Sequence, residues 1–114
     1  MKIFVLSALL IISVNMVQAA NVDTPITTII KLNAYVTTSA WDGDIEINVN
    51  DSSAGCESGY WLKYEDKASY KNIVSILLSA FHAGSLVKLT GDDTQRWPVS
   101  SSNYCRLHTV SLSK

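Results

Sequence analysis

The sequence predicts a mostly β fold with one α-helix, arranged as an OB-fold-like five-stranded barrel. Alternating apolar and polar residues recur in five segments, and one segment between the third and fourth has the period of a helix. Three strands, a helix and two more strands follow the order expected of the OB-fold, a partly open Greek-key barrel. Another small α+β fold, with one helix packed on an antiparallel sheet, stays open as the alternative.

The first 20 residues have the three parts of a secretory signal peptide. Lys2 supplies the positive charge, a short apolar run follows, and small residues close the segment. The run is shorter than the roughly 20 apolar residues that span a bilayer. We therefore expect cleavage after Ala19 or Ala20, a secreted or periplasmic location, and no stable membrane insertion of the mature residues 21–114.

The mature chain is long enough for one small domain, and it contains two cysteines, Cys56 and Cys105. A domain of this size buries only roughly 60% of its unfolded surface, so it often needs a covalent link. An even cysteine count in an exported chain indicates a disulfide rather than a metal or catalytic thiol pair. Closing a loop of about 50 residues stabilises the fold by on the order of 4 kcal/mol.

The charge of the chain argues against nucleic acid as a partner. Loss of Lys2 leaves eight basic and ten acidic residues, a net charge of −2. The basic residues are scattered along the sequence and form no stripe. Because nucleic-acid binding depends on clustered positive charge, we expect none here.

Two strands joined by a turn are expected first. Residues 29–37 alternate, with four apolar residues on the face expected to be buried: Ile30, Leu32, Ala34 and Val36. Residues 45–49 alternate again. Between them, Asp42 and Gly43 form the dipeptide that tight hairpins prefer, which predicts an antiparallel pair.

A third strand and a helix follow. Residues 56–64 are expected to place Tyr60, Leu62 and Tyr64 on the core face and Trp61 on the outer wall, under the helix or in a subunit contact. The next apolar residues have helical spacing: Tyr70, Ile73, Val74, Leu77, Leu78 and Phe81. Asp66 or Ser69 is expected to cap the start of this helix, and Gly84 to end it.

The last two strands are predicted at residues 85–91 and 104–113, on either side of a loop. That loop contains Trp97, and Trp41 lies in the first turn. In OB-folds these two loops flank the ligand-binding face. Indole and phenol rings combine flat apolar surface with a polar atom, which suits sugar rings and protein contacts alike. We expect five side chains to face a ligand: Trp41, Asp42, Arg96, Trp97 and Tyr104. The alternative is that each tryptophan ring closes an end of the barrel.

Signatures of catalysis or metal binding are weak. Three acidic pairs occur: Asp42 with Asp44, Glu65 with Asp66, and Asp92 with Asp93. Glycosidases need two carboxylates on either side of a cleft, whereas turns and helix caps explain acids of this kind equally well. His82 and His108 lack further ligands at metal-binding spacing. We expect no catalytic residue, metal or cofactor, and keep a small hydrolase as a minor alternative.

The run CESGYWLKY … YKNIVSILLSAFHAGSLVKL … YCRLHTVSL resembles the B subunits of subtilase-cytotoxin and typhoid-toxin type AB5 toxins, and related small exported bacterial proteins. The likeness covers about residues 56 to 112 and consists of a Cys-led strand, a helix ending in Gly and a closing Cys-containing strand. Those subunits are pentamers of OB-folds that bind cell-surface glycans. The resemblance therefore implies an exported OB-fold that binds rather than catalyses, and a homo-oligomeric ring.

Together these observations predict an exported, non-enzymatic OB-fold-like domain linked by Cys56–Cys105, which binds a glycan or a protein partner. The alternative of a different class is an accessory subunit, whose partner covers the outer face that carries Trp61.

Overall fold

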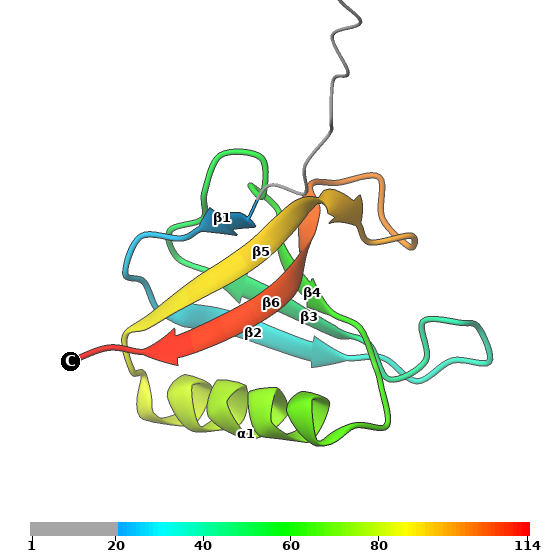
Figure 1. Cartoon of the computed structure of the whole chain (residues 1–114), viewed down its shortest axis with the longest axis horizontal. Coiled ribbons are helices and arrows are strands. Elements are labelled where there is room, and N and C mark those ends of the chain that lie inside the picture. The colour runs from blue at the N-terminus through cyan, green and yellow to red at the C-terminus, as the bar shows by residue number, and fades with distance from the viewer. Residues whose placement is uncertain (1–20) are drawn as a thin grey trace, which may run out of the picture.

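The computed structural model describes residues 21–114, so the expected signal peptide lies outside the described residues. This part of the chain forms six strands and one helix (Figure 1). Their bounds are β1 (Asn21–Asp23), β2 (Ile29–Ala34), β3 (Ile45–Val49), β4 (Gly59–Leu62), α1 (Ala68–Ala83), β5 (Val87–Arg96) and β6 (Tyr104–Leu112). The expected class, mostly β with one helix, is confirmed.

The strands form one mixed sheet in the order β1-β5-β6-β4-β3-β2, rather than a closed five-stranded barrel. Only β4 and β6 are parallel neighbours; every other pair is antiparallel. The additional strand β1 pairs with β5 from Asn21 to Asp23, and buried Thr24 extends this contact by donating its backbone N–H to the carbonyl of Leu89, 2.8 Å away. Thr27 then forms an isolated bridge with Val87, after which β2 continues along β3 instead.

The first hairpin pairs β2 with β3 as expected, but three of the four residues expected in the core are exposed: Ile30, Ala34 and Val36. The register shifts between Ile29 and Lys31, which marks a β-bulge. As a result Ile29 is buried at 7% exposure, and Ile30, which was expected in the core, is 57% exposed. Val36 was also expected in the core; it lies beyond β2 and is 97% exposed.

The turn between these strands, residues 35–44, folds back on the rest of the domain. Gly43 has φ +83°, a conformation that L side chains rarely adopt, and a Cβ there would lie 2.8 Å from Cγ of Tyr64. The carboxylate of Asp42 accepts the backbone N–H of Thr37 at 2.8 Å. The expected Asp-Gly turn is therefore present, and it packs against the segment after β4.

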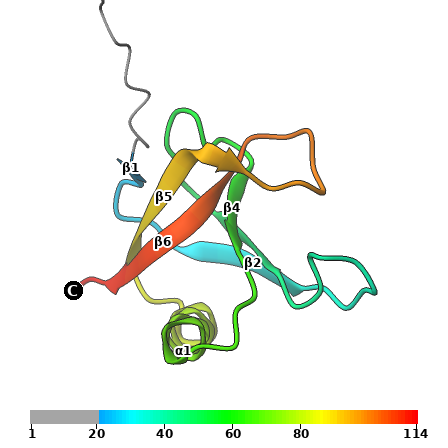
Figure 2. The same ribbon diagram turned by 45° about the vertical axis from the view of Figure 1, so that its right-hand side comes forward.

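Helix α1 lies at one end of the sheet, where it contacts β2 and β6 (Figure 2). The expected capping by Asp66 or Ser69 is wrong, because the residue before the helix is Lys67 and it makes no side-chain cap bond. Gly84 ends the helix in the left-handed conformation, as expected. Leu77 and Ala80 face the core, so the neighbouring Leu78 and Phe81 are more exposed than the helical pattern predicts.

All four residues of β4 are buried, because both faces of this strand are covered. Tyr60 and Leu62 face the core as expected, whereas Tyr64, also expected there, lies beyond β4 and is 48% exposed. Gly91 of β5 lets the Tyr60 ring approach, because a Cβ on Gly91 would be 2.6 Å from that ring. Cys56, before β4, and Cys105, in β6, form the predicted disulfide. Strand β5 runs on to Arg96, so the loop before β6 is shorter than the sequence suggests.

Candidate functional site

The loop between β5 and β6, residues 97–103, projects beyond the ends of these strands (Figures 1 and 2), and its first residue anchors it to the domain; we call it the cover loop. Its first residue, Trp97, is 2% exposed. The Trp97 ring lies between two tyrosines, edge to face, with centroids 5.3 Å from Tyr35 and 5.4 Å from Tyr104. Such aromatic pairs add about 0.5–1.5 kcal/mol beyond their burial. Trp97 therefore fastens the cover loop to the sheet.

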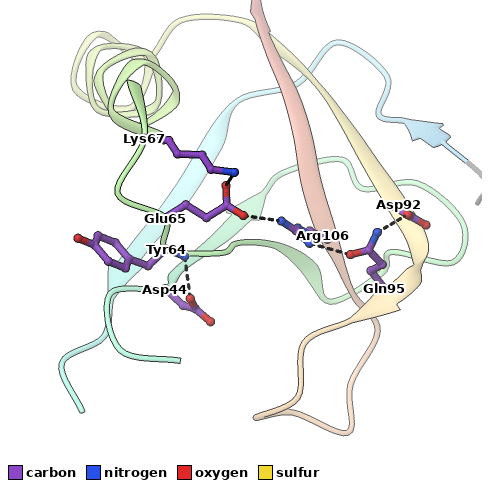
Figure 3. Close-up of polar contacts among 7 residues, drawn as sticks. All are labelled: Asp44, Tyr64, Glu65, Lys67, Asp92, Gln95 and Arg106. Atoms are coloured by element: carbon purple, nitrogen blue, oxygen red, sulfur yellow. Dashed lines mark hydrogen bonds and ion pairs between the residues drawn. The ribbon is translucent and has the colours of Figure 1, made fainter. Parts of the chain in front are cut away.

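A buried carboxylate completes this attachment. The indole N–H of Trp97 donates to Oδ2 of Asp44 at 3.1 Å. The backbone N–H of Tyr64 donates to Oδ1 of the same carboxylate at 2.9 Å (Figure 3). Asp44 is almost fully buried, and both of its oxygens have a donor. A buried charge is tolerated when it is bonded in this way. Asp44 thus connects the 35–44 turn, the end of β4 and the cover loop.

The other end of the cover loop is fixed near the disulfide. Asn103 donates its side-chain N–H to Oε2 of Glu57 at 2.9 Å, and the backbone N–H of Gly55 donates to Oε1 at 2.8 Å. These two bonds lower the pKa of Glu57 to about 2. Arg96, just before the loop, donates to the carbonyl of Gly55 at 2.7 Å. Both ends of the cover loop are therefore held.

Trp61 lies on the outer face of β4, as expected from its position opposite Leu62. It does not pack under the helix: its indole N–H donates to the carbonyl of Gln95 at 3.1 Å, and the ring is 6% exposed. The guanidinium of Arg106 lies over the ring, 5.8 Å from its centroid. Trp61 is consequently unavailable for the large subunit contact considered above.

A small hollow of about 190 Å³ lies between the 35–44 turn and the cover loop. We call it the aromatic hollow. Its lining is mainly apolar, with one buried acid and one exposed base at its edge. The lining residues are Ala40, Trp41, Asp44, Trp61, Lys63 and Pro98.

The five residues expected to face a ligand are not brought together. Trp41 lines the aromatic hollow, and its ring contacts Tyr35 with centroids 5.7 Å apart. Trp97 and half-buried Tyr104 lie beside each other; neither lines the hollow, although Trp97 is bonded to its lining residue Asp44. Asp42 holds the turn, and Arg96 is bonded to the Gly55 segment.

Five lining residues of the aromatic hollow were not among the predicted ligand-facing residues: Ala40, Asp44, Trp61, Lys63 and Pro98. Lys63 shares strand parity with Trp61, and Pro98 follows Trp97 directly, so the sequence contains a signal for these two. The sequence does not show that the three segments carrying these residues lie close together in space. Those segments are the 35–44 turn, β4 with the residue after it, and the cover loop.

A second hollow, of about 320 Å³, opens between the start of α1 and the strands β4 and β6. We call it the charged hollow. Its lining combines four apolar or aromatic side chains with three basic side chains, one acid and one serine. The lining residues are Leu62, Lys63, Glu65, Ser69, Tyr70, Ile73, Arg106, Leu107 and His108.

A chain of polar contacts crosses one side of the charged hollow (Figure 3). Glu65 receives Nζ of Lys67 and Nη2 of Arg106, each at 3.3 Å. Both cations lower the pKa of Glu65, and Lys67 has the larger effect. Arg106 also donates through Nη1 to the side-chain oxygen of Gln95 at 2.9 Å, and Gln95 donates to Asp92. The guanidinium is thereby held in one orientation.

The acidic pairs that raised the possibility of hydrolysis have other partners. Asp92 is fully buried and accepts bonds from the side chains of Thr94 and Gln95; the Thr94 bonds lower its pKa. Asp66 is exposed and pairs with Lys71 at 3.8 Å. In residues 21–114 there is no group of three or more His, Cys, Asp or Glu residues arranged to hold a metal ion.

No helix within the described part of the chain is long and apolar enough to cross a membrane. Comparison of the chain with protein-family models, curated proteins and solved structures returns no match.

Proposed function

We propose that the mature chain is an exported, non-catalytic binding domain of OB-fold type, which recognises a glycan at the aromatic hollow. The observation that carries the proposal is the position of this hollow, between the turn after β2 and the loop after β5. In OB-folds the corresponding loops flank the ligand-binding face. The function proposed is thus that of a toxin B subunit, in agreement with the resemblance given above.

Two features of the sheet support the OB-fold arrangement. The parallel pair β4–β6 places the last strand beside the first hairpin, and the isolated bridge between Thr27 and Val87 brings the segment before β2 beside β5. Contacts of this kind are expected of a curled sheet that approaches a partly open barrel. The helix lies in the chain between the third and fourth of the five longer strands, as in the expected order.

The chemistry of the hollow suits a single sugar ring. Trp41 and Trp61 provide aromatic surface, and Lys63 provides three N–H donors at the edge. Its volume of about 190 Å³ is below the roughly 300–1,000 Å³ of sites for drug-sized ligands. One ring of a larger glycan therefore fits, with the remainder of the chain in solvent.

The surroundings of the hollow are rigid, which favours binding. Trp97 and Asp44 fix the cover loop beneath Pro98, and the disulfide fixes its far end. A site held in place before the ligand arrives loses less conformational entropy on binding. This rigidity accounts for the buried Trp97, which has no ligand-facing surface of its own.

A glycan array with the purified mature protein tests the proposal, followed by titration of the best glycan. We expect Trp41→Ala to weaken binding at least tenfold, about 1.4 kcal/mol. Val36→Ala is the matched control, since Val36 is in the same turn and almost fully exposed. Absence of any bound glycan on the array, or equal affinity of Trp41→Ala and wild type, contradicts the proposal.

An accessory or ring-forming subunit is the second candidate, favoured by apolar side chains at the end of α1. Leu78, Phe81 and Leu86 are each exposed by more than 40%. We expect light scattering to give a mass above that of the monomer, and Phe81→Ser to reduce it. A strict monomer that co-purifies with no partner contradicts this candidate.

A further inference from the structure

We propose that the charged hollow is a second binding site, which takes a carboxylate group carried on a short apolar stem. It differs from the aromatic hollow in charge, size and lining, and the two share only Lys63. The inference does not depend on glycan binding at the aromatic hollow.

Positive charge gathers around this hollow although the mature chain is acidic. Lys63 and Arg106 line it, and Lys67 lies beside it through its contact with Glu65. Three of the eight Lys and Arg residues of the mature chain are therefore at one place. A concave surface with charge of one sign raises the local concentration of ligands of the opposite sign.

The hollow has cationic groups with unused bonding capacity. Lys63 is exposed and makes no ion pair with the described residues. Arg106 has five N–H donors, of which its bonds to Gln95 and Glu65 use two. A ligand carboxylate can therefore be bound by Lys63 and by the guanidinium together.

Glu65 already offers a carboxylate to this site, but it is held at long distances. Its two contacts, to Arg106 and Lys67, are both 3.3 Å, whereas charge-assisted N–H···O bonds are typically about 2.7–2.9 Å. A ligand carboxylate that reaches Arg106 with better geometry competes with Glu65. Glu65 thus acts as an internal competitor, and its removal is expected to tighten binding.

The apolar part of the lining of the hollow explains the apolar stem. Leu62, Ile73 and Leu107 contribute aliphatic surface to its lining, and Tyr70 contributes an aromatic ring. Burial of a stem on this surface gains about 25 cal/mol per Å² of apolar area. Inorganic anions have no apolar surface to bury, so they do not gain this free energy. The site therefore favours an amphipathic acid over phosphate.

The orientation of Arg106 is set before a ligand arrives. Its guanidinium packs over the Trp61 ring. Gln95, itself bonded to buried Asp92, accepts one N–H of the guanidinium (Figure 3). Arg106 is therefore a binding residue with a fixed side chain, which lowers the entropic cost of binding.

Titration by NMR with N-acetylleucine tests the proposal, with N-acetylleucine amide as the neutral probe of the same shape. We expect saturable shifts at Leu62, Ile73 and Leu107 with the acid, and at least tenfold weaker binding of the amide. Equal binding of acid and amide, or binding of inorganic phosphate as tight as that of the acid, overturns it. Peptides ending in leucine form a further arm: tighter binding than N-acetylleucine identifies a peptide C-terminus as the source, and weaker binding identifies a free acid.

Three variants strengthen the test, because one is expected to weaken binding, one to tighten it and one to leave it unchanged. Lys63→Met is expected to weaken binding at least fivefold and Glu65→Gln to tighten it at least twofold. Lys88→Met, which removes an exposed lysine paired with Asp23 on β1, is expected to leave it unchanged. Weaker binding in Glu65→Gln, or a Lys88→Met effect as large as that of Lys63→Met, overturns the proposal. Trp41→Ala is expected to keep this site intact, which separates it from the glycan site.

Discussion

The two faces of β4 are both buried, but by different means. On the inner face, Tyr60 and Leu62 pack against the apolar core formed with β5 and β6. On the outer face, Trp61 is covered by the end of β5 and by Arg106, held by directed contacts. The inner face is stabilised by burial of apolar surface, which does not depend on exact geometry. The outer face, with the cover loop beside it, depends instead on a few hydrogen bonds and one disulfide.

This difference explains where the candidate sites lie. Side chains held by directed contacts keep fixed positions without being enclosed by an apolar core, so they can line a site that is in place before a ligand arrives. The aromatic hollow is bounded by the cover loop through Pro98, and the charged hollow includes Arg106 from the outer layer. Variants that remove the contacts of the cover loop one at a time test whether the inner core responds.

Removal of the disulfide is expected to have the largest effect. The variant Cys56→Ser with Cys105→Ser frees a loop with a sequence separation of 49 residues. In the chain-entropy treatment this lowers the free energy of unfolding by about 4 kcal/mol. Urea unfolding at neutral pH, followed by tryptophan fluorescence, measures the change.

The matched comparison is Leu89→Ala, a fully buried residue of the inner core, for which a loss of about 2–5 kcal/mol is expected. If the cover loop depends on the disulfide, hydrogen exchange of its backbone amides accelerates more in the cysteine variant than in Leu89→Ala. Equal acceleration in both variants contradicts the separation of the two faces.

The elements with strong local signals were predicted correctly from the sequence. The helical spacing up to Phe81 and the Gly84 end are local, and each was confirmed. The Asp42-Gly43 turn is likewise set by backbone preference. The disulfide required no geometry, because two cysteines in a chain expected to be exported allow one pairing.

What the sequence missed depends on contacts between distant segments. Ile30 is exposed because a bulge shifts the alternation, and no residue type marks that position. The direction of the Trp97 ring is set by Asp44, 53 residues away in the chain. The aromatic hollow itself combines three separate segments, so Trp41 was recognised and Lys63 was not.

Loss of the Trp97–Asp44 bond is expected to have an intermediate effect. Trp97→Phe keeps an aromatic ring between Tyr35 and Tyr104 but leaves Oδ2 of the buried Asp44 without its donor. An unsatisfied buried acceptor costs about 1–3 kcal/mol. Thermal or urea unfolding measures this loss, and exchange in the cover loop shows where it acts.

Val99→Ala is the control in the same loop, since its side chain is partly exposed; a change within about 0.5 kcal/mol is expected. Should Trp97→Phe also stay within that range, the bond to Asp44 is not what holds the cover loop. Faster exchange in β5 and α1, with none in the loop, assigns the ring to the inner core instead.

The smallest effect is expected at Glu57, and it is expected to depend on pH. The backbone N–H of Gly55 and the side chain of Asn103 lower its pKa from 4.5 to about 2. A carboxyl whose pKa is lower in the folded state stabilises the fold above its unfolded pKa and loses that contribution as pH falls through the folded pKa. The stabilisation is therefore complete above about pH 5 and declines toward pH 2.

Glu57→Gln removes the charge with little change in shape, so wild type is expected to be more stable than this variant at pH 7. The difference should narrow between pH 5 and pH 2, and it should shrink in high salt because Glu57 is exposed. Asn103→Ala removes only the donor to Oε2. The stability difference between wild type and this variant should therefore follow the same pH trend but be smaller than that for Glu57→Gln. Urea unfolding across this pH range measures both differences. A difference that stays constant with pH would mean that Glu57 holds the cover loop through its shape alone, and that the outer face is less dependent on charge than its contacts indicate.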